Sequence, residues 1–142
     1  MRKLLVAVDG SENAFRALDY ATSLAQYGAA ITIHLIYVYE DVSYGHRSHA
    51  FHSNEELARP SRERGEAVLN ASASRVTASG VQVVPVLSAG DVAETVVSHA
   101  ETLGCDSIVM GMKGQNLLSE LVLGSTAMTV LHATKLPVTL VK

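Results

Sequence analysis

The segment 108–126, IVMGMKGQNLLSELVLGST, contains three glycines at a spacing that suits the binding of an anion. Two residues separate Gly111 from Gly114, and nine more precede Gly124, which is followed directly by a Ser-Thr pair. Glycine lets the backbone approach a ligand without a Cβ in the way. The residues after Gly124 have helical periodicity, and the first N–H groups of a helix lack partners within the helix and favour phosphate. We therefore predict a nucleotide-phosphate loop.

The elements that must position this loop can be predicted from apolar patterns. Strands are expected at five apolar runs, residues 4–8, 30–38, 81–87, 106–110 and 137–141. Helical spacing of apolar residues predicts a helix between each pair of strands, beginning at Ser11, Ser53, Asp91 and Ser125.

Two prolines bear on these predicted elements. Pro60 is expected to break the first part of the second helix, because proline suits a first turn and not a helix interior. Pro85 lies within the third strand and argues for an edge position, because proline cannot donate a hydrogen bond to a neighbouring strand.

The alternation of strands and helices predicts an α/β fold, with residues 1–142 forming a single domain. We expect a doubly wound, five-stranded parallel sheet with strand order 3-2-1-4-5 and helices on both faces. This order makes the first and fourth strands neighbours at a topological switch point, where ligands bind beyond the carboxyl ends of strands. The first strand ends at Asp9 and the fourth at Gly111, so both residues are expected at one crevice.

Composition excludes several classes of function. With 48% hydrophobic and 18% charged residues, the 142-residue chain is typical of a globular protein. A net charge of −3, with two Phe, five Tyr and no Trp, argues against nucleic-acid binding. The first apolar run is too short for a signal peptide, and no run reaches membrane length. One cysteine excludes an internal disulfide and fits a reducing compartment, so we expect a cytoplasmic protein.

The glycine motif also carries a family resemblance. Gly111, Gly114, Gly124 and Ser125 satisfy the pattern Gly-x2-Gly-x9-Gly-Ser/Thr. The aspartate after the first strand and the apolar closing strand match in kind and order. Over essentially its whole length, the chain resembles the ATP-binding branch of the universal stress protein (UspA) superfamily.

This resemblance implies a Rossmann-like fold and a role for individual residues around ATP. The phosphates would be held by the backbone amides of Gly111, Met112, Lys113, Gly114, Gln115 and Asn116 and by the hydroxyls of Ser125 and Thr126, with Gly124 also part of the site. Ala7 and Asp9 would border the adenosine, and backbone groups of Leu35 would meet the adenine edge. The implied cofactor is ATP, with or without Mg²⁺ or Mn²⁺, and no flavin or haem is expected. Met112 departs from the family pattern of a small polar residue, so one side-chain bond to the ligand is expected to be missing.

The function implied by the resemblance is that of an ATP-binding regulatory module of the stress response, with slow or absent hydrolysis. No spacing in the sequence assigns a general base or a catalytic dyad. Two alternatives stay open: a dimeric interaction module that binds no nucleotide, and a slow ATP hydrolase. The resemblance also implies a homodimer, formed through strand 137–141, which would otherwise be an exposed apolar edge.

Simpler interpretations accompany several of these residues. The glycines could serve only as turns, Asp9 could merely cap the first helix, and Lys113 could be a solvated loop residue. His46, His49 and His52 are spaced like metal ligands, but without carboxylate or cysteine neighbours a polar loop is favoured. Cys105, beside an apolar strand, is expected to be a small buried filler.

Overall fold

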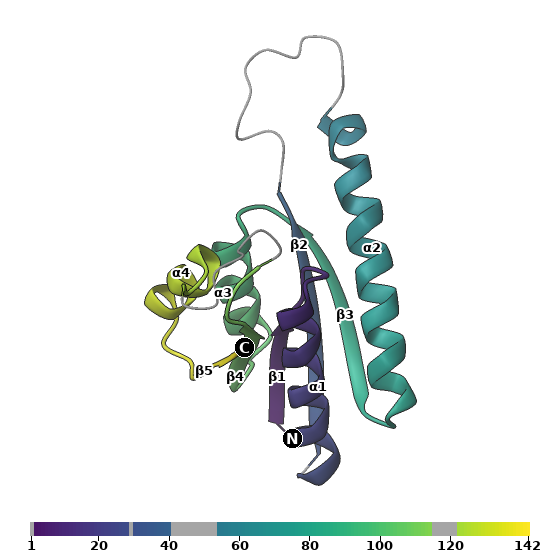
Figure 1. Cartoon of the computed structure of the whole chain (residues 1–142), viewed down its shortest axis with the longest axis vertical. Coiled ribbons are helices and arrows are strands. Elements are labelled where there is room, and N and C mark those ends of the chain that lie inside the picture. The colour runs from purple at the N-terminus through teal and green to yellow at the C-terminus, as the bar shows by residue number, and fades with distance from the viewer. Residues whose placement is uncertain (1, 29, 41–53, 115–121) are drawn as a thin grey trace.

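The computed structural model describes residues 2–28, 30–40, 54–114 and 122–142. Its strands are β1 (Arg2–Ala7), β2 (Ile31–Tyr39), β3 (Gln82–Ala89), β4 (Ser107–Gly111) and β5 (Val138–Val141). Its helices are α1 (Glu12–Tyr27), α2 (Asn54–Ala78), α3 (Val92–Thr102) and α4 (Ser125–Ala133). Strands and helices alternate as predicted, with small shifts at their boundaries (Figure 1).

The strands form one parallel sheet in the order β3-β2-β1-β4-β5, which confirms the predicted strand order. β1 lies at the centre and pairs with β2 on one side and with β4 on the other. Its residues Leu4, Leu5 and Val6 are all buried. A continuous apolar run forms such a strand because both faces of a parallel sheet are covered by helices.

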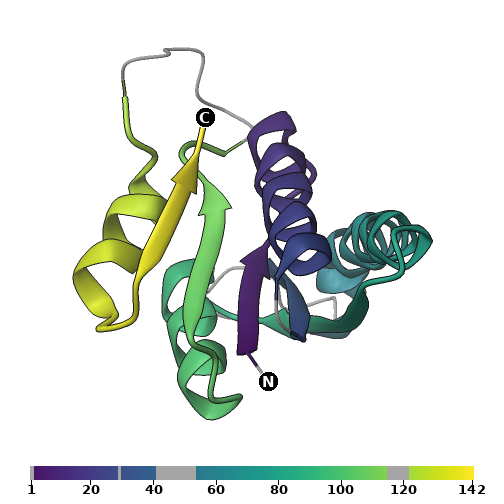
Figure 2. The ribbon, with the colours of Figure 1, turned by 90° about the horizontal axis from the view of Figure 1, so that it is seen from below.

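Helices cover both faces of this sheet. Figure 2 shows α1 and α2 on one side and α3 and α4 on the other. Successive side chains of β2 point to opposite faces, as the geometry of a strand requires. Ile33 and Leu35 pack in the core beneath α1 and α2, whereas Ile36 packs in the core beneath α3 and α4. Val38, partly buried, packs against the second core.

The two prolines have different outcomes. Pro85 lies in β3, an edge strand, as predicted. The predicted break at Pro60 is wrong, because α2 continues through this residue. Proline in a helix interior costs about 3 kcal/mol through a lost hydrogen bond and a steric clash. The carbonyl group that the N–H of residue 60 would normally reach belongs to Glu56, and both Glu56 and Pro60 are exposed, so water can reach this carbonyl and the helix tolerates the proline.

Cys105 confirms its predicted role as a buried filler. It is 5% exposed and packs in the core beneath α3 and α4. Burial raises the pKa of its thiol, which keeps the group protonated and unreactive. The three histidines at positions 46, 49 and 52 lie outside the described residues. None of the described helices is both long and apolar enough to cross a lipid bilayer.

His34 is a buried polar residue in the sheet. Its side chain is 8% exposed, and its Nδ1 atom has no hydrogen-bond partner among the described residues. Burial, followed by the nearby ammonium group of Lys3, lowers the pKa of His34 below its ordinary value. The folded protein therefore holds this imidazole in its neutral form.

We expect this burial to make folding sensitive to acid. Because the pKa of His34 is lower in the folded state, the unfolded chain binds the proton more tightly, and stability rises with pH. The stability linked to His34 is complete above the unfolded value of about 6.5 and is lost as pH falls below it. Urea denaturation of the wild type and of His34→Leu between pH 8 and pH 5 measures this effect. The wild-type free energy of unfolding should fall more steeply on acidification, and parallel pH profiles would contradict the assignment.

Candidate functional site

The carboxyl ends of β1 and β4 meet at the switch point of the sheet. Ala7 of β1 pairs with Met110 of β4, so both strands end at the same level. Helix α1 leaves β1 over one face, and α3 leads into β4 over the other. A cavity of about 710 Å³ opens here, on the side of α3 and α4. This volume lies within the roughly 300–1,000 Å³ of small-molecule sites.

A tight turn after β1 forms one wall of the cavity. The Asp9 carboxylate accepts a hydrogen bond from the backbone N–H of Ser11 through Oδ1, at 2.8 Å. Gly10 supplies a positive φ of 83° in this turn, a conformation that favours glycine. Ser11 caps α1, because its Oγ accepts a hydrogen bond from the N–H of Ala14 at 3.2 Å. Asp9 thus shapes the turn, and the cap of α1 is Ser11.

Two glycines of the motif allow a close approach between the end of β4 and this turn. A Cβ on Gly111 would lie 3.0 Å from the backbone N of Ala14 and from the C and Cβ atoms of Asn13. A Cβ on Gly114 would lie 3.2 Å from Oδ2 of Asp9. These contacts explain why glycine occupies both positions. Gly111 packs against the first turn of α1, and Gly114 packs against the Asp9 turn.

The third glycine joins the loop to α4. The N–H of Gly124 donates to the carbonyl oxygen of Met112 at 2.9 Å, and the N–H of Met112 donates to Val141 at 2.8 Å. These bonds fix the start of α4 beside the ends of β4 and β5. Gly124 is also the N-cap residue of α4, and it offers no side-chain cap.

The start of α4 therefore differs from the starts of α1 and α3. Side-chain oxygens of Ser11 and Asp91 cap those two helices. At α4, the residues Ser125, Thr126 and Ala127 of the first turn line the cavity. The first N–H groups of a helix have no partners within it, and they carry the positive end of the helix dipole. This end of the cavity can accept an anion.

Another part of the cavity wall is apolar. Ile36 and Val38 extend from β2, and Val92 and Val96 from α3. Such a wall suits the flat, weakly polar face of an aromatic ring. The sequence interpretation missed these four residues. For the two residues of β2, the sequence did offer a signal. Side chains alternate along a strand, so Ile36 and Val38 must share one face, while Leu35 faces the other.

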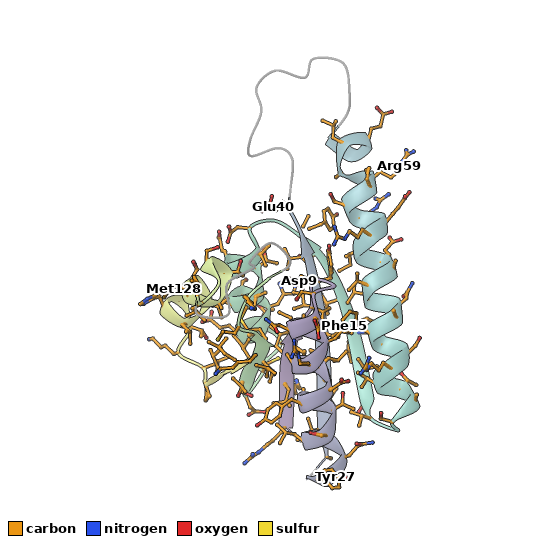
Figure 3. All side chains as sticks on the ribbon, viewed as in Figure 1. Asp9, Phe15, Tyr27, Glu40, Arg59 and Met128 are labelled. Atoms are coloured by element: carbon orange, nitrogen blue, oxygen red, sulfur yellow. The ribbon has the colours of Figure 1, made fainter. Side chains whose placement is uncertain are left out.

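Most of the predicted site residues come together in this cavity. Its lining includes Ala7, Asp9, Gly111, Met112, Lys113, Gly114, Gly124, Ser125 and Thr126. Figure 3 labels Asp9 after β1 and Met128, a further lining residue, on α4. The cavity lining does not include Leu35, whose side chain packs in the core beneath α1 and α2, and the contact expected of its backbone groups stays a prediction. Gln115 and Asn116 lie outside the described residues.

The universal stress protein family model matches residues 1–142. The chain belongs to this family. Among its relatives, Universal stress protein YxiE of Bacillus subtilis is 28% identical, with 99% of this chain and 98% of the relative covered. Universal stress protein MJ0531 of Methanocaldococcus jannaschii is 30% identical, with 99% and 82% covered.

Solved structures of the family share the fold. UspA from Lactobacillus plantarum matches with a TM-score of 0.83 at 23% identity, covering 99% of this chain and 97% of that one. A universal stress protein in complex with cAMP matches with a TM-score of 0.74 at 22% identity, covering 99% and 97%. The Archaeoglobus fulgidus protein in complex with dAMP matches with a TM-score of 0.74 at 19% identity, covering 100% and 98%.

The packing of this universal stress protein predicts unequal costs for two glycine substitutions. Gly111→Ala should lower the free energy of unfolding by about 1–3 kcal/mol, because its Cβ meets the backbone of α1, which moves only with the helix. Gly114→Ala should cost less, because its Cβ meets one carboxylate oxygen of Asp9 at 3.2 Å, and a side-chain oxygen can shift by a few tenths of an ångström more easily than helix backbone can. Urea denaturation of both variants beside the wild type measures the difference. Equal losses would argue against the close contact between β4 and α1.

Proposed function

We propose that this universal stress protein binds an adenine nucleotide, with ATP as its regulatory ligand, in the cavity at the switch point. The observation that carries the proposal is the polarity of the cavity. The start of α4, which no side chain caps among the described residues, contributes hydrogen-bond donors to the lining, and Ile36 and Val38 contribute apolar side chains. A nucleotide has the same division, with anionic phosphates joined to an aromatic base.

The phosphates are assigned to the α4 end of the cavity. N–H groups of the first turn, together with the hydroxyls of Ser125 and Thr126, are the donors there. Each charge-assisted hydrogen bond to phosphate is worth roughly 1.5–3 kcal/mol. A few such bonds suffice for micromolar affinity, about 8 kcal/mol.

The nucleoside is assigned to the region between the Asp9 turn and the apolar wall. An ionised carboxylate only accepts hydrogen bonds, so Asp9 suits the hydroxyls of a ribose and would repel a phosphate. Ile36, Val38, Val92 and Val96 can pack against the base. The complexes of family members with cAMP and dAMP support an adenine nucleotide as the ligand class.

A regulatory role fits this architecture better than rapid catalysis. The proposed phosphate contacts are backbone amides and hydroxyls, which hold a ligand without activating a nucleophile. Asp9 supplies a carboxylate to the lining, and its Oδ1 is already engaged with the turn. We therefore propose slow or absent hydrolysis. The single cysteine of the chain supports a reducing compartment, the cytoplasm.

We also propose a homodimer formed through β5. This strand occupies the edge of the sheet beside β4, and its sequence, VTLV, is apolar. An exposed apolar edge strand is an aggregation hazard, which pairing with the same strand of a second copy removes.

Nucleotide binding should appear as a thermal shift. At ATP concentrations about one hundred times Kd, binding adds roughly 2.7 kcal/mol, which raises Tm by on the order of 5–10 °C. Melts with ATP and AMP, each with and without Mg²⁺, should show this shift, and GTP should give a smaller one. An unchanged Tm at millimolar ATP would refute the nucleotide assignment.

Two glycine variants test, by the same thermal shift, where the ligand binds. Gly124→Val should abolish the ATP shift, because a branched side chain would enter the phosphate end of the cavity. Gly80→Asn is the control: Gly80 lies outside the cavity, a Cβ there would meet no atom within 4 Å, and asparagine tolerates its positive φ. If Gly124→Val lowers Tm by itself, the double variant Ser125→Ala with Thr126→Ala serves instead. A full ATP shift in Gly124→Val, or in the Ser125→Ala with Thr126→Ala double variant, would contradict the phosphate assignment.

The dimer should depend on the character of β5. Val138→Lys places a charge on the edge strand and should give a monomer by size exclusion with light scattering. Ser98→Lys, on an exposed position of α3, adds the same charge elsewhere and should elute as the wild type. Circular dichroism checks that both variants are folded. A dimer that survives Val138→Lys would count against pairing through β5.

A further inference from the structure

The methionines of the described chain are gathered at one place. The sequence has four methionines, and Met1 lies outside the described residues. The other three, Met110, Met112 and Met128, all line the cavity at the switch point. They come from different elements: β4, the loop that follows it, and α4. Three different parts of the chain therefore each bring a methionine to the lining of the proposed nucleotide site.

These side chains differ in their access to solvent. Met110 is 6% exposed, Met112 is half-buried, and Met128 is 45% exposed. Oxidation of methionine depends on access of the oxidant to the sulfur. A water-soluble oxidant would reach Met128 first, then Met112, and would reach Met110 last.

Met128 also lies close to the uncapped start of α4. It is the fourth residue of the helix, and its N–H donates to the carbonyl oxygen of Gly124 at 3.0 Å. Side chains in a helix lean toward its N-terminus, so the Met128 thioether extends back toward the first turn. A polar group on this sulfur would therefore lie near the proposed phosphate position.

We propose that Met128, followed by Met112, is a site of reversible oxidation by hydrogen peroxide, and that the oxidation weakens nucleotide binding. This inference rests on the proposed function. A lone pair of the thioether sulfur attacks one peroxide oxygen, the O–O bond breaks, and an S–O bond forms. The displaced oxygen leaves as water after taking up the remaining proton. The sulfur loses two electrons to the peroxide, and the product is methionine sulfoxide.

The sulfoxide opposes the ligand in two ways. Its oxygen is a hydrogen-bond acceptor with a partial negative charge, so it competes with a phosphate for the first N–H groups of α4. It also converts a flexible apolar side chain into a polar one, which disturbs the packing of the cavity. Loss of one well-made polar contact corresponds to a fall in affinity of roughly tenfold.

The test compares ATP affinity before and after peroxide. Calorimetry first gives the Kd of the untreated protein. The protein is then treated with hydrogen peroxide, and peptide mass spectrometry measures sulfoxide at each methionine. Sulfoxide should form at Met128 before Met110, and Kd should rise roughly tenfold. Methionine sulfoxide reductases should restore the original Kd. ATP present during the treatment should slow oxidation of Met128 several-fold.

A double variant, Met112→Leu with Met128→Leu, is the matched control. Its Kd after peroxide is compared with its own Kd before treatment, and the two should agree. Complete oxidation of Met128 with no change in wild-type Kd would overturn the inference. An equal loss of affinity in the double variant would do the same, because the damage would then lie elsewhere. If the untreated wild type does not bind ATP, the proposed function itself fails, and the inference fails with it.

Discussion

The contact between Gly111 and the first turn of α1 is the constraint on which the site depends. A Cβ at this position would lie 3.0 Å from backbone atoms of Asn13 and Ala14, so glycine lets β4 end this close to α1 without displacing the helix. This approach sets the end of β4 beside the Asp9 turn. The hydrogen bond from Gly124 to Met112 then carries α4 to the same place. The cavity follows from these backbone contacts before any ligand is considered.

The helix starts show how the fold leaves an opening for a ligand. Ser11 and Asp91 satisfy N–H groups of α1 and α3 with their own oxygens. Gly124 has no side chain with which to do so for α4. Among the residues that the structure describes, no side chain caps α4, and a capping side chain is typically worth about 1 kcal/mol. The phosphates of the proposed nucleotide would act as acceptors for the first N–H groups of α4, which links binding to folding.

The sequence was sufficient to predict the strand order and much of the site. Uninterrupted apolar runs such as Leu4–Val8 belong to buried parallel strands, and parallel strands with right-handed crossovers leave few arrangements. Two features could not be predicted from the sequence. Pro60 was expected to break α2, but its local solvent exposure decides the outcome. The apolar wall depends on which face of β2 carries α3, and this choice places the side chain of Ile36, and not that of Leu35, at the cavity.

Side chains alternate between the two faces of β2, so neighbouring residues of this strand have different roles. Leu35 packs beneath α1 and α2, where it contributes to the stability of the fold. Ile36 lies on the other face, where it contributes to the core and to the cavity. The proposed phosphate contacts use mainly backbone groups, which any sequence supplies once the glycines permit the geometry. Discrimination among bases must therefore come from side chains such as Ile36, Val38 and Val92. For this reason, differences in ligand preference within such a site should arise at its apolar wall.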